Sequence, residues 1–369
     1  MSNGPTLTIL AGPTVPAPLP PRIVELLDSA TVSTRGGRED GFELRFRMSG
    51  RNRLTDLLLA GAQSPEFRVI LIVTFRGTPT IIADGVMVHH QIDSQGEQPT
   101  LVLQGRGLAE LMDREDRTGQ VQYMGLPPTT RVQMILARYA RFGMLPLVFP
   151  SIGNAAPDPL ERSPTHQGTD LQYVQHLAEG AGNDFYILPG PATGTSTAYW
   201  GPPTKVGLPQ PALNVTVGAN RNVEQLNFRI DTSRHEQPTI TLHEPITKMA
   251  IPVSIPPFSP LNPALGALRL APALKTRVPG AAKKSLAEAL VEGFAAASRS
   301  QDTVFGTGTL SVLRYGHVLR PRNPVLVRGA TEAFDGLYYV SEVTHSIQRG
   351  RYTQSFELRR DGLMSTVSL

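Results

Sequence analysis

The chain has 369 residues, 40% of them hydrophobic and 18% charged, a composition that excludes a disordered chain and leaves room for two or three domains. The net charge of +4 is scattered without a run of five Lys or Arg, so a mixed-charge surface is favoured over a nucleic-acid-binding one. The absence of cysteine excludes disulfides and thiolate metal sites, and 33 prolines with 34 glycines favour short strands and turns over a helical bundle.

The N-terminal region contains one segment whose secondary structure the sequence leaves open and one that is clearly a strand. Residues 1–20 are extended and punctuated by proline, and residues 22–30 leave open a choice between a helical turn and a strand. In residues 41–48, apolar and charged side chains alternate. This period of two is typical of a strand with one wet face.

Three further strands complete a predicted antiparallel meander that curls into a sheet or small barrel. Residues 67–75 and 80–90 form two of them, joined by the turn Arg76–Pro79, and residues 98–105 form the third. The dipeptide Asp84–Gly85 inside the second strand predicts a bulge or bend.

The composition then changes to an α+β segment over residues 108 to about 190. Residues 107–114 have a helical pattern, and residues 128–142 predict an amphipathic helix that Thr129 or Thr130 could cap. Its apolar stripe consists of Val132, Ile135, Leu136, Tyr139 and Phe142. A third helix begins after Thr169 and ends at Gly180, and a strand over 184–188 follows it.

Strand signals return after a Gly/Pro/Thr-rich connector at residues 191–211. The expected elements are strands at 212–217 and 223–230, a Pro/Ala/Leu-rich excursion at 245–280, and a helix at 286–297 with Ser285 as its cap.

The C-terminal region is again predicted to be all β, with strands at 309–315, 324–328, 337–347 and 351–359. The turn 348–350 joins the last two strands into a hairpin. Strict alternation puts Tyr339, Ser341, Val343 and His345 on one face, and Tyr338, Val340, Glu342 and Thr344 on the other. The aromatic residues Phe42, Phe46, Tyr338 and Tyr339 are interpreted as sheet core or subunit contacts.

No catalytic or cofactor-binding motif stands out, so the sequence predicts no catalytic, cofactor or metal site. Phosphate-binding loops, zinc-protease motifs and nucleophile elbows are absent. His89 and His90 are adjacent in a strand and point to opposite faces, and His166 and His176 lie ten residues apart without a carboxylate at ligand spacing. The charged residues 114–117 are interpreted as a solvated helix end.

The C-terminal hairpin carries a series of spaced residues: Val340, Val343, His345, Ile347, Gly350, Tyr352, Phe356, Leu358 and Arg360. This series resembles the closing hairpin of the phage late control protein D family, the baseplate hub proteins of contractile tails and contractile injection systems. Residues 169–179 with 183–187 resemble the helix-then-strand element of the family, and residues 199–202 with 219–228 resemble the start of its second β domain. The resemblance extends to the hub part of valine-glycine-repeat spike proteins.

The resemblance implies an α+β, mainly β fold with two tail-tube-like β-barrel domains. The expected domains are residues 1–107 as the first barrel, 108–204 as an α+β domain, and 205–245 with 305–369 as the second barrel. Residues 246–304 would form an extended excursion with a short helix that packs outside the barrels. Three such subunits would form a pseudo-sixfold ring between a hexameric tail tube and a trimeric spike.

These inferences predict a structural subunit that is not an enzyme. Its expected partners are two further copies of itself, a separate spike protein, the tail-tube protein and other baseplate proteins, with no direct specific nucleic-acid binding. With no signal peptide and no transmembrane segment evident, we expect assembly in the cytoplasm and incorporation into a particle. The alternatives are a virion-tail adhesion or carbohydrate-binding β-protein and, third, an enzyme of unrecognised type.

Overall fold

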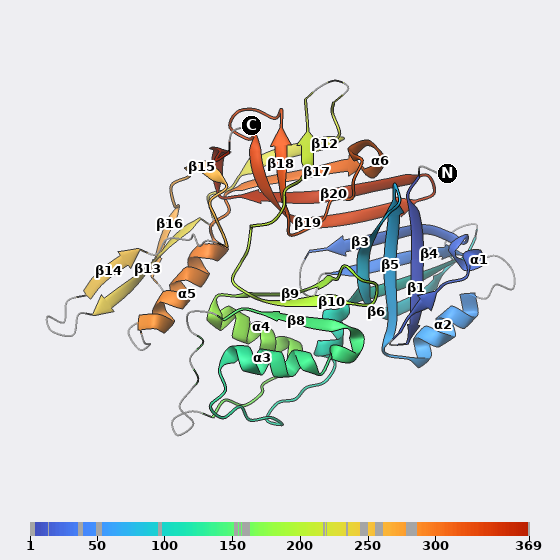
Figure 1. Ribbon diagram of the computed structural model, residues 1–369, viewed down its shortest axis with the longest axis horizontal. Coiled ribbons are helices and arrows are strands. Elements are labelled where there is room, and N and C mark those ends of the chain that lie inside the picture. The colour runs from blue at the N-terminus through green and yellow to red at the C-terminus, as the bar shows by residue number, and fades with distance from the viewer. Residues whose placement is uncertain are drawn as a thin grey trace.

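The computed structural model describes most of the chain (Figure 1). The described residues are 4–13, 15–35, 40–48, 54–94, 98–150, 154, 156, 163–216, 218, 220–233, 235–243, 250–254, 261–277 and 286–367. The fold is mainly β, as predicted, and none of the described helices is long and apolar enough to cross a bilayer.

The N-terminal half of a 13-stranded sheet has the strand order β3-β4-β7-β6-β5-β1-β2. Its elements are β1 (Thr6–Pro13), β2 (Ala17–Pro18), α1 (Pro21–Val24), β3 (Leu27–Thr34), β4 (Gly41–Arg47), α2 (Leu54–Gln63), β5 (Phe67–Phe75), β6 (Thr78–Asp93) and β7 (Thr100–Gly107). The hairpins β5–β6 and β6–β7 of the predicted meander are confirmed, but its first strand, β4, pairs with β7 and not with β5. The segment 22–30 holds both the end of a short helix and the start of a strand. The helix α2 was not predicted.

The bulge in β6 lies close to the predicted place but not on it. Leu71 pairs with Ala83 and Ile72 with Ile81, so Ile82 is the extra residue. Gly85 serves another purpose, because a Cβ at this position would overlap the backbone of Arg106 on β7. The glycine therefore marks a close approach of two strands.

The C-terminal half of the sheet has the order β12-β17-β20-β19, with β18 and β11 continuing from β19. Its elements are β11 (Gln210–Asn214), β12 (Gln225–Ile230), β17 (Val304–Ser311), α6 (Val312–Tyr315), β18 (Pro324–Arg328), β19 (Gly336–Gln348) and β20 (Arg351–Arg360). The predicted C-terminal hairpin is β19–β20.

A bulge corrects the predicted faces of β19. Ser341 has no partner on β20, because Val340 pairs with Leu358 and Glu342 with Glu357. The extra residue reverses the alternation, so Tyr338 and Val340 share the buried face with Val343 and His345. Strict alternation had separated these two pairs.

The two halves repeat one strand order. In the N-terminal half it is β3-β4-β7-β6-β5-β1, and in the C-terminal half β12-β17-β20-β19-β18-β11. A helix follows the second strand of each order, α2 after β4 and α6 after β17. The fifth and sixth strands of each order pair with each other, antiparallel for β5–β1 and parallel for β18–β11. The 13 strands of the large sheet form an open sheet and, among the described residues, no closed barrel, because β1 does not pair with β3.

The halves are joined by the pairing of β19 with β3. Six residue pairs connect them, from Val343 opposite Thr34 to Gln348 opposite Ser29. One hydrophobic core runs under both halves and includes Phe42, Phe46 and Tyr338, which were interpreted as sheet core. The large sheet is therefore a single packed unit.

The α+β unit lies against this sheet (Figure 1). It consists of η2 (Leu108–Asp113), α3 (Pro128–Ala137), η3 (Ala140–Phe142), β8 (Met144–Val148), α4 (Asp170–Ala181), β9 (Asp184–Pro189) and β10 (Ser196–Gly201), with the sheet order β8-β10-β9. The predicted connector 191–211 thus contains β10. The apolar stripe of α3 is buried against Trp200 and the inward side of α4.

The helix boundaries differ from the prediction. The helix predicted over 128–142 ends at Ala137, and the 3-10 helix η3 follows it. Pro127 precedes α3 and no side chain caps it, so Thr129 and Thr130 lie in its first turn. Thr169 forms a capping box with Gln172 at the start of α4. The helix ends at Gly182 in the left-handed conformation, beyond the predicted stop at Gly180.

A small outlying unit contains most of the excursion. Its elements are β13 (Glu236–His243), β14 (Ala250–Ser254), β16 (Leu274–Arg277) and α5 (Leu286–Arg299). Strand β15 (Gly266–Arg269) instead pairs with β21 (Gly362–Ser365). Because β13 pairs with β14 and β16, this unit begins at Glu236, ten residues before the predicted boundary at position 246. The predicted cap Ser285 lies outside the described residues.

Replacement of Val340 by Asp is expected to unfold the large sheet. Val340 is fully buried in the shared core, so an unpaired carboxylate there should lower the free energy of unfolding by about 3–5 kcal/mol. Urea denaturation measures this change. Leu313→Asp is the control, because Leu313 is half exposed and its replacement should cost no more than about 0.5 kcal/mol. Equal stability of the two variants would contradict the assignment of the core.

Candidate functional site

The titratable residues do not form a metal centre in the described part of the chain, where no group of three His, Cys, Asp or Glu has suitable geometry. His89 and His90 are exposed and lie opposite Gln104 and Leu103, which confirms that they face opposite sides of the sheet. His166 is buried instead, and its Nδ1 lies 2.9 Å from the hydroxyl of Tyr123.

Asp170 is the centre of a buried polar cluster at the start of α4. Its carboxylate accepts hydrogen bonds from Arg138, at 3.0 and 3.2 Å, and from the hydroxyl of Tyr139 at 2.8 Å. Arg117 approaches to 3.8 Å and His166 Nε2 to 3.4 Å. The segment 114–117 is thus more than a solvated helix end, since Arg117 helps to neutralise a buried carboxylate. Burial lowers the pKa of His166.

A second buried ion pair attaches the α+β unit to the large sheet. Arg68 on β5 donates two hydrogen bonds to Asp84 on β6, at 2.7 and 2.6 Å, and both side chains are buried. From the α+β unit, Ser196 donates to Asp84 at 3.0 Å and the carbonyl of Gly194 accepts from Arg68 at 3.1 Å. Such a four-membered network satisfies charges that would be costly alone.

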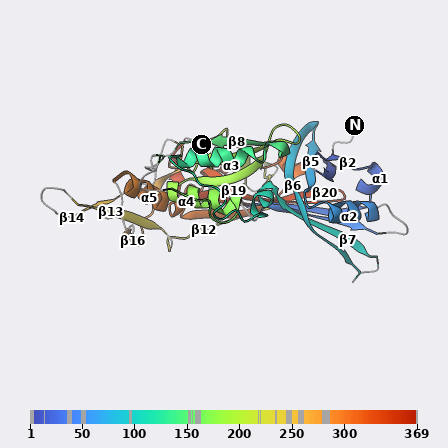
Figure 2. The same ribbon diagram turned by 90° about the horizontal axis from the view of Figure 1, so that it is seen from below.

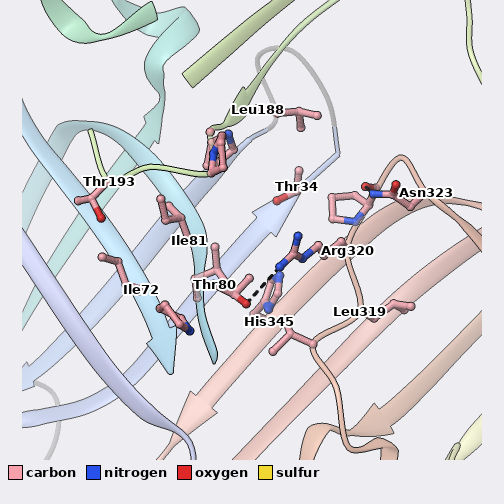
Figure 3. Close-up of a pocket in the computed structure, with 17 residues that line it drawn as sticks. Thr34, Ile72, Thr80, Ile81, Leu188, Thr193, Leu319, Arg320, Asn323 and His345 are labelled. Atoms are coloured by element: carbon pink, nitrogen blue, oxygen red, sulfur yellow. Dashed lines mark hydrogen bonds between the residues drawn. The ribbon is translucent and has the colours of Figure 1, made fainter. Parts of the chain in front are cut away.

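A cleft of about 380 Å³ opens where the two halves of the sheet meet the α+β unit (Figure 3). Thr80 comes from β6, Thr193 from the loop after β9, and Arg320 from the loop before β18. The guanidinium of Arg320 donates to the Thr80 hydroxyl at 3.4 Å. Prolines and aliphatic side chains form most of the remaining wall, so the described residues bring no pair of acid and base groups together here.

His345 lies at the bottom of this cleft, among the buried side chains of β19. Its Nδ1 lies 2.7 Å from the hydroxyl of Tyr352. Desolvation lowers the pKa of His345 to about 3, so the imidazole is neutral near pH 7 and shares a hydrogen bond with the Tyr352 hydroxyl through Nδ1. His345, one of the residues that matched the family pattern, is therefore a core residue.

The polar face of the large sheet is a further candidate site. Residues directly opposite one another on paired strands point to the same face. One row crosses five strands through Gln225, Thr309, Ser355, Thr344 and Ser33. A second row runs from β20 to β6 through Thr353, Ser346, Thr31, Glu43, Gln104 and His89. A shallow groove follows the first row.

Several charges on this face are paired within the face. Arg45 donates to Glu43 at 2.7 Å, and Gln104 donates to the other oxygen of Glu43 at 2.8 Å, which lowers the pKa of this carboxyl. Arg359 similarly donates to Glu357 at 2.8 Å. The sequence analysis did not identify this face, because it arises only when strands distant in the chain are paired.

No protein-family model matches the sequence, and no curated protein matches it either. Several solved structures do share its fold. A tail protein from Neisseria meningitidis has a TM-score of 0.65 over 98% of both chains at 14% identity. The 43 kDa tail protein of prophage MuSo2 from Shewanella oneidensis has a TM-score of 0.60 at 12% identity, covering 96% of this chain and 98% of its own.

A component of the E. coli type VI secretion system, itself structurally similar to the T4 bacteriophage tail proteins gp27 and gp5, has a TM-score of 0.52. The match covers 90% of this chain and 73% of that one at 13% identity. The chain therefore has the fold of phage tail proteins and of a related secretion-system component. This is the class of fold that the C-terminal hairpin pattern predicted.

Loss of the Arg68 guanidinium is expected to destabilise the protein strongly. Arg68→Met leaves the carboxylate of Asp84 buried without its cation and should cost about 3–5 kcal/mol in urea denaturation. The double variant Arg68→Met/Asp84→Leu should recover most of this loss. Arg141→Met is the matched control, because Arg141 pairs with Glu66 at the surface and should cost no more than about 1 kcal/mol. A double variant no more stable than Arg68→Met would contradict this account.

Stability should fall with acid in a way that depends on His345. Because its folded-state pKa is about 3, the unfolded chain binds a proton below about pH 6.5 while the folded chain does not. The free energy of unfolding should decrease from pH 6.5 towards 4 by up to about 1.4 kcal/mol per pH unit from this residue. In His345→Gln the slope should be shallower, whatever its stability at pH 7. An unchanged slope would show that His345 titrates alike in both states.

Proposed function

We propose that this chain is a structural baseplate hub subunit of a phage-tail-like contractile injection system, without catalytic activity. In this proposal three copies form a pseudo-sixfold ring that connects a hexameric tail tube to a trimeric spike. The observation that carries it is the repeated strand order of the two sheet halves. Three chains with two similar halves each place six similar units around one axis, which matches a sixfold tube while keeping threefold symmetry.

The sheet halves take the role of the two tube-like domains in this proposal. They correspond to residues 1–107 and to 205–245 with 305–369, and each would complete its barrel-like form in the ring. The α+β domain at 108–204 and the region 246–304 would pack outside. The likeness to phage tail proteins over almost the whole chain supports this division.

The polar face of the sheet is proposed to line the central channel. Hydroxyl, amide and self-paired charged side chains cover it, and such a surface is compatible with water on one side of a sheet whose other side is a core. The tube would stack on one end of the ring and a separate spike protein would bind the other, with further baseplate proteins contacting the outside.

The proposal predicts a threefold ring. Purified protein alone should give three times the mass of one chain in light scattering, and a complex with the tube and spike proteins encoded beside it should contain three copies of this chain. Electron microscopy should show an annulus with a channel. Val340→Asp is the negative control, since its sheet should not form. A monomer both alone and with these neighbours would refute the proposal, and binding of that monomer to glycans would favour an adhesion protein instead.

A further inference from the structure

The junction between β19 and β3 provides a template for a contact that the single chain leaves incomplete. In the repeated strand order, β19 is the fourth strand of its half and β3 is the first. The matching strands of the opposite halves are β6 and β12. Within one chain β6 and β12 lie far apart in the sheet and do not pair.

No described strand pairs with the outer edge of the second part of β6. β5 pairs with β6 only as far as Val86, and β7 occupies the other side as far as Asp93. His89 to Ile92 are all exposed, and the β6–β7 hairpin projects from the body of the molecule (Figure 2). Ile92 lies opposite the buried Leu101, so it is on the core face, yet it is 55% exposed.

β12 has the complementary free edge at the other end of the sheet. It pairs with β17 alone among the described strands. Ile230 lies opposite the buried Val304 and is therefore on the core face, yet it is 48% exposed. Asp231 donates its N–H to Thr303 on the side of β17. Alternation along the strand then directs the N–H groups of Phe228 and Ile230 to the free edge.

We propose that the edge of β6 at residues 89–93 pairs, antiparallel, with the edge of β12 in a second copy of this chain. This inference rests on the proposed ring and says through which strands neighbouring subunits of the ring would pair. The pairing is heterologous, since two unlike edges meet, and such contacts generate closed rings when the rotation permits. Each added copy fills one free edge and presents another, which removes every open edge at these positions once the ring closes.

Matching bulges set the register of this contact. Val88 is the extra residue of β6 against β7, as Ser341 is of β19 against β20. Val343 lies two residues after the bulge in β19 and is opposite Thr34 of β3. His90 lies two residues after the bulge in β6 and is therefore the counterpart of Val343. We expect His90 to lie opposite the residue of β12 that corresponds to Thr34. Across the ladders, His90 leads through Leu103 and Leu44 to Ala30, as Val343 leads through Phe356 and Gly308 to Leu226. Ala30 thus corresponds to Leu226, and Thr34, four residues further on, corresponds to Ile230.

The register brings like faces together. Ile92 then lies opposite Phe228 on the core face, and Gln91 lies opposite Arg229 on the polar face. The half-exposed Ile92 and Ile230 become covered, and the polar face continues from one copy to the next.

The absence of native cysteine allows a direct test by disulfide cross-linking. Directly opposite residues on antiparallel strands have Cα atoms about 4.5–5.5 Å apart, within the range of a disulfide. The variant Gln91→Cys/Arg229→Cys should form covalent dimers and a closed covalent trimer on oxidation, and reduction should release them. The matched control Gln91→Cys/Gln225→Cys moves one thiol four residues along the same face, about 13 Å away, and should form no such species.

The outcomes separate this inference from the proposed function. Both variants are first checked by urea denaturation for the stability of the parent chain and by electron microscopy for rings. Rings in which the first variant cross-links no better than the control would overturn the β6–β12 contact and leave the hub function standing. Stable chains that never form rings, alone or with the tube and spike proteins, would overturn both.

Discussion

The pairing of β3 with β19 is the constraint on which the rest of the structure depends. The hydroxyls of Ser33 and Thr344 meet there across 311 positions of the chain. Closing a loop of this length costs about 5 kcal/mol by (3/2)RT ln n. Six residue pairs at about one hydrogen bond each and about 1 kcal/mol per bond roughly offset this. The shared core beneath, where Val32 packs in one cluster with Val343, supplies the surplus that keeps the halves together.

The other units are attached to this sheet through buried polar contacts. The Arg68–Asp84 pair holds the loop before β10, and Asp361 accepts backbone N–H groups of Leu265 and Gly266 at 2.7 and 3.1 Å, which fixes β15 beside β21. Buried polar contacts of this kind have strict geometry. They therefore fix the orientation of each attached unit, whereas apolar packing alone tolerates sliding.

Strands with clear alternation were predictable from the sequence, and contacts between distant strands were not. β5 and β18 match their predicted bounds because the apolar runs end at turn residues. The prediction of which side chains share a face of β19 was wrong, because the one-residue bulge at Ser341 depends on the partner strand and leaves no pattern in the local sequence. β10 was missed because its six residues lie within a Gly/Pro/Thr-rich segment and are held by β8 and β9. The polar face and the Asp170 cluster likewise require three-dimensional pairing.

The polar groups that already have hydrogen-bond partners within the chain, and the strand edges that have no partner strand among the described residues, together indicate how such a chain associates. On the polar face, Glu43 and Glu357 already accept hydrogen bonds from neighbours on the same face, so another protein would have to replace these bonds with equal ones and gain little. The edges of β6 and β12 differ, because no described strand pairs with them on their outer sides and Ile92 and Ile230 lie exposed beside them. Pairing there adds hydrogen bonds and buries apolar surface at once. Association through edges, with the face left to water, is the arrangement that this distribution favours.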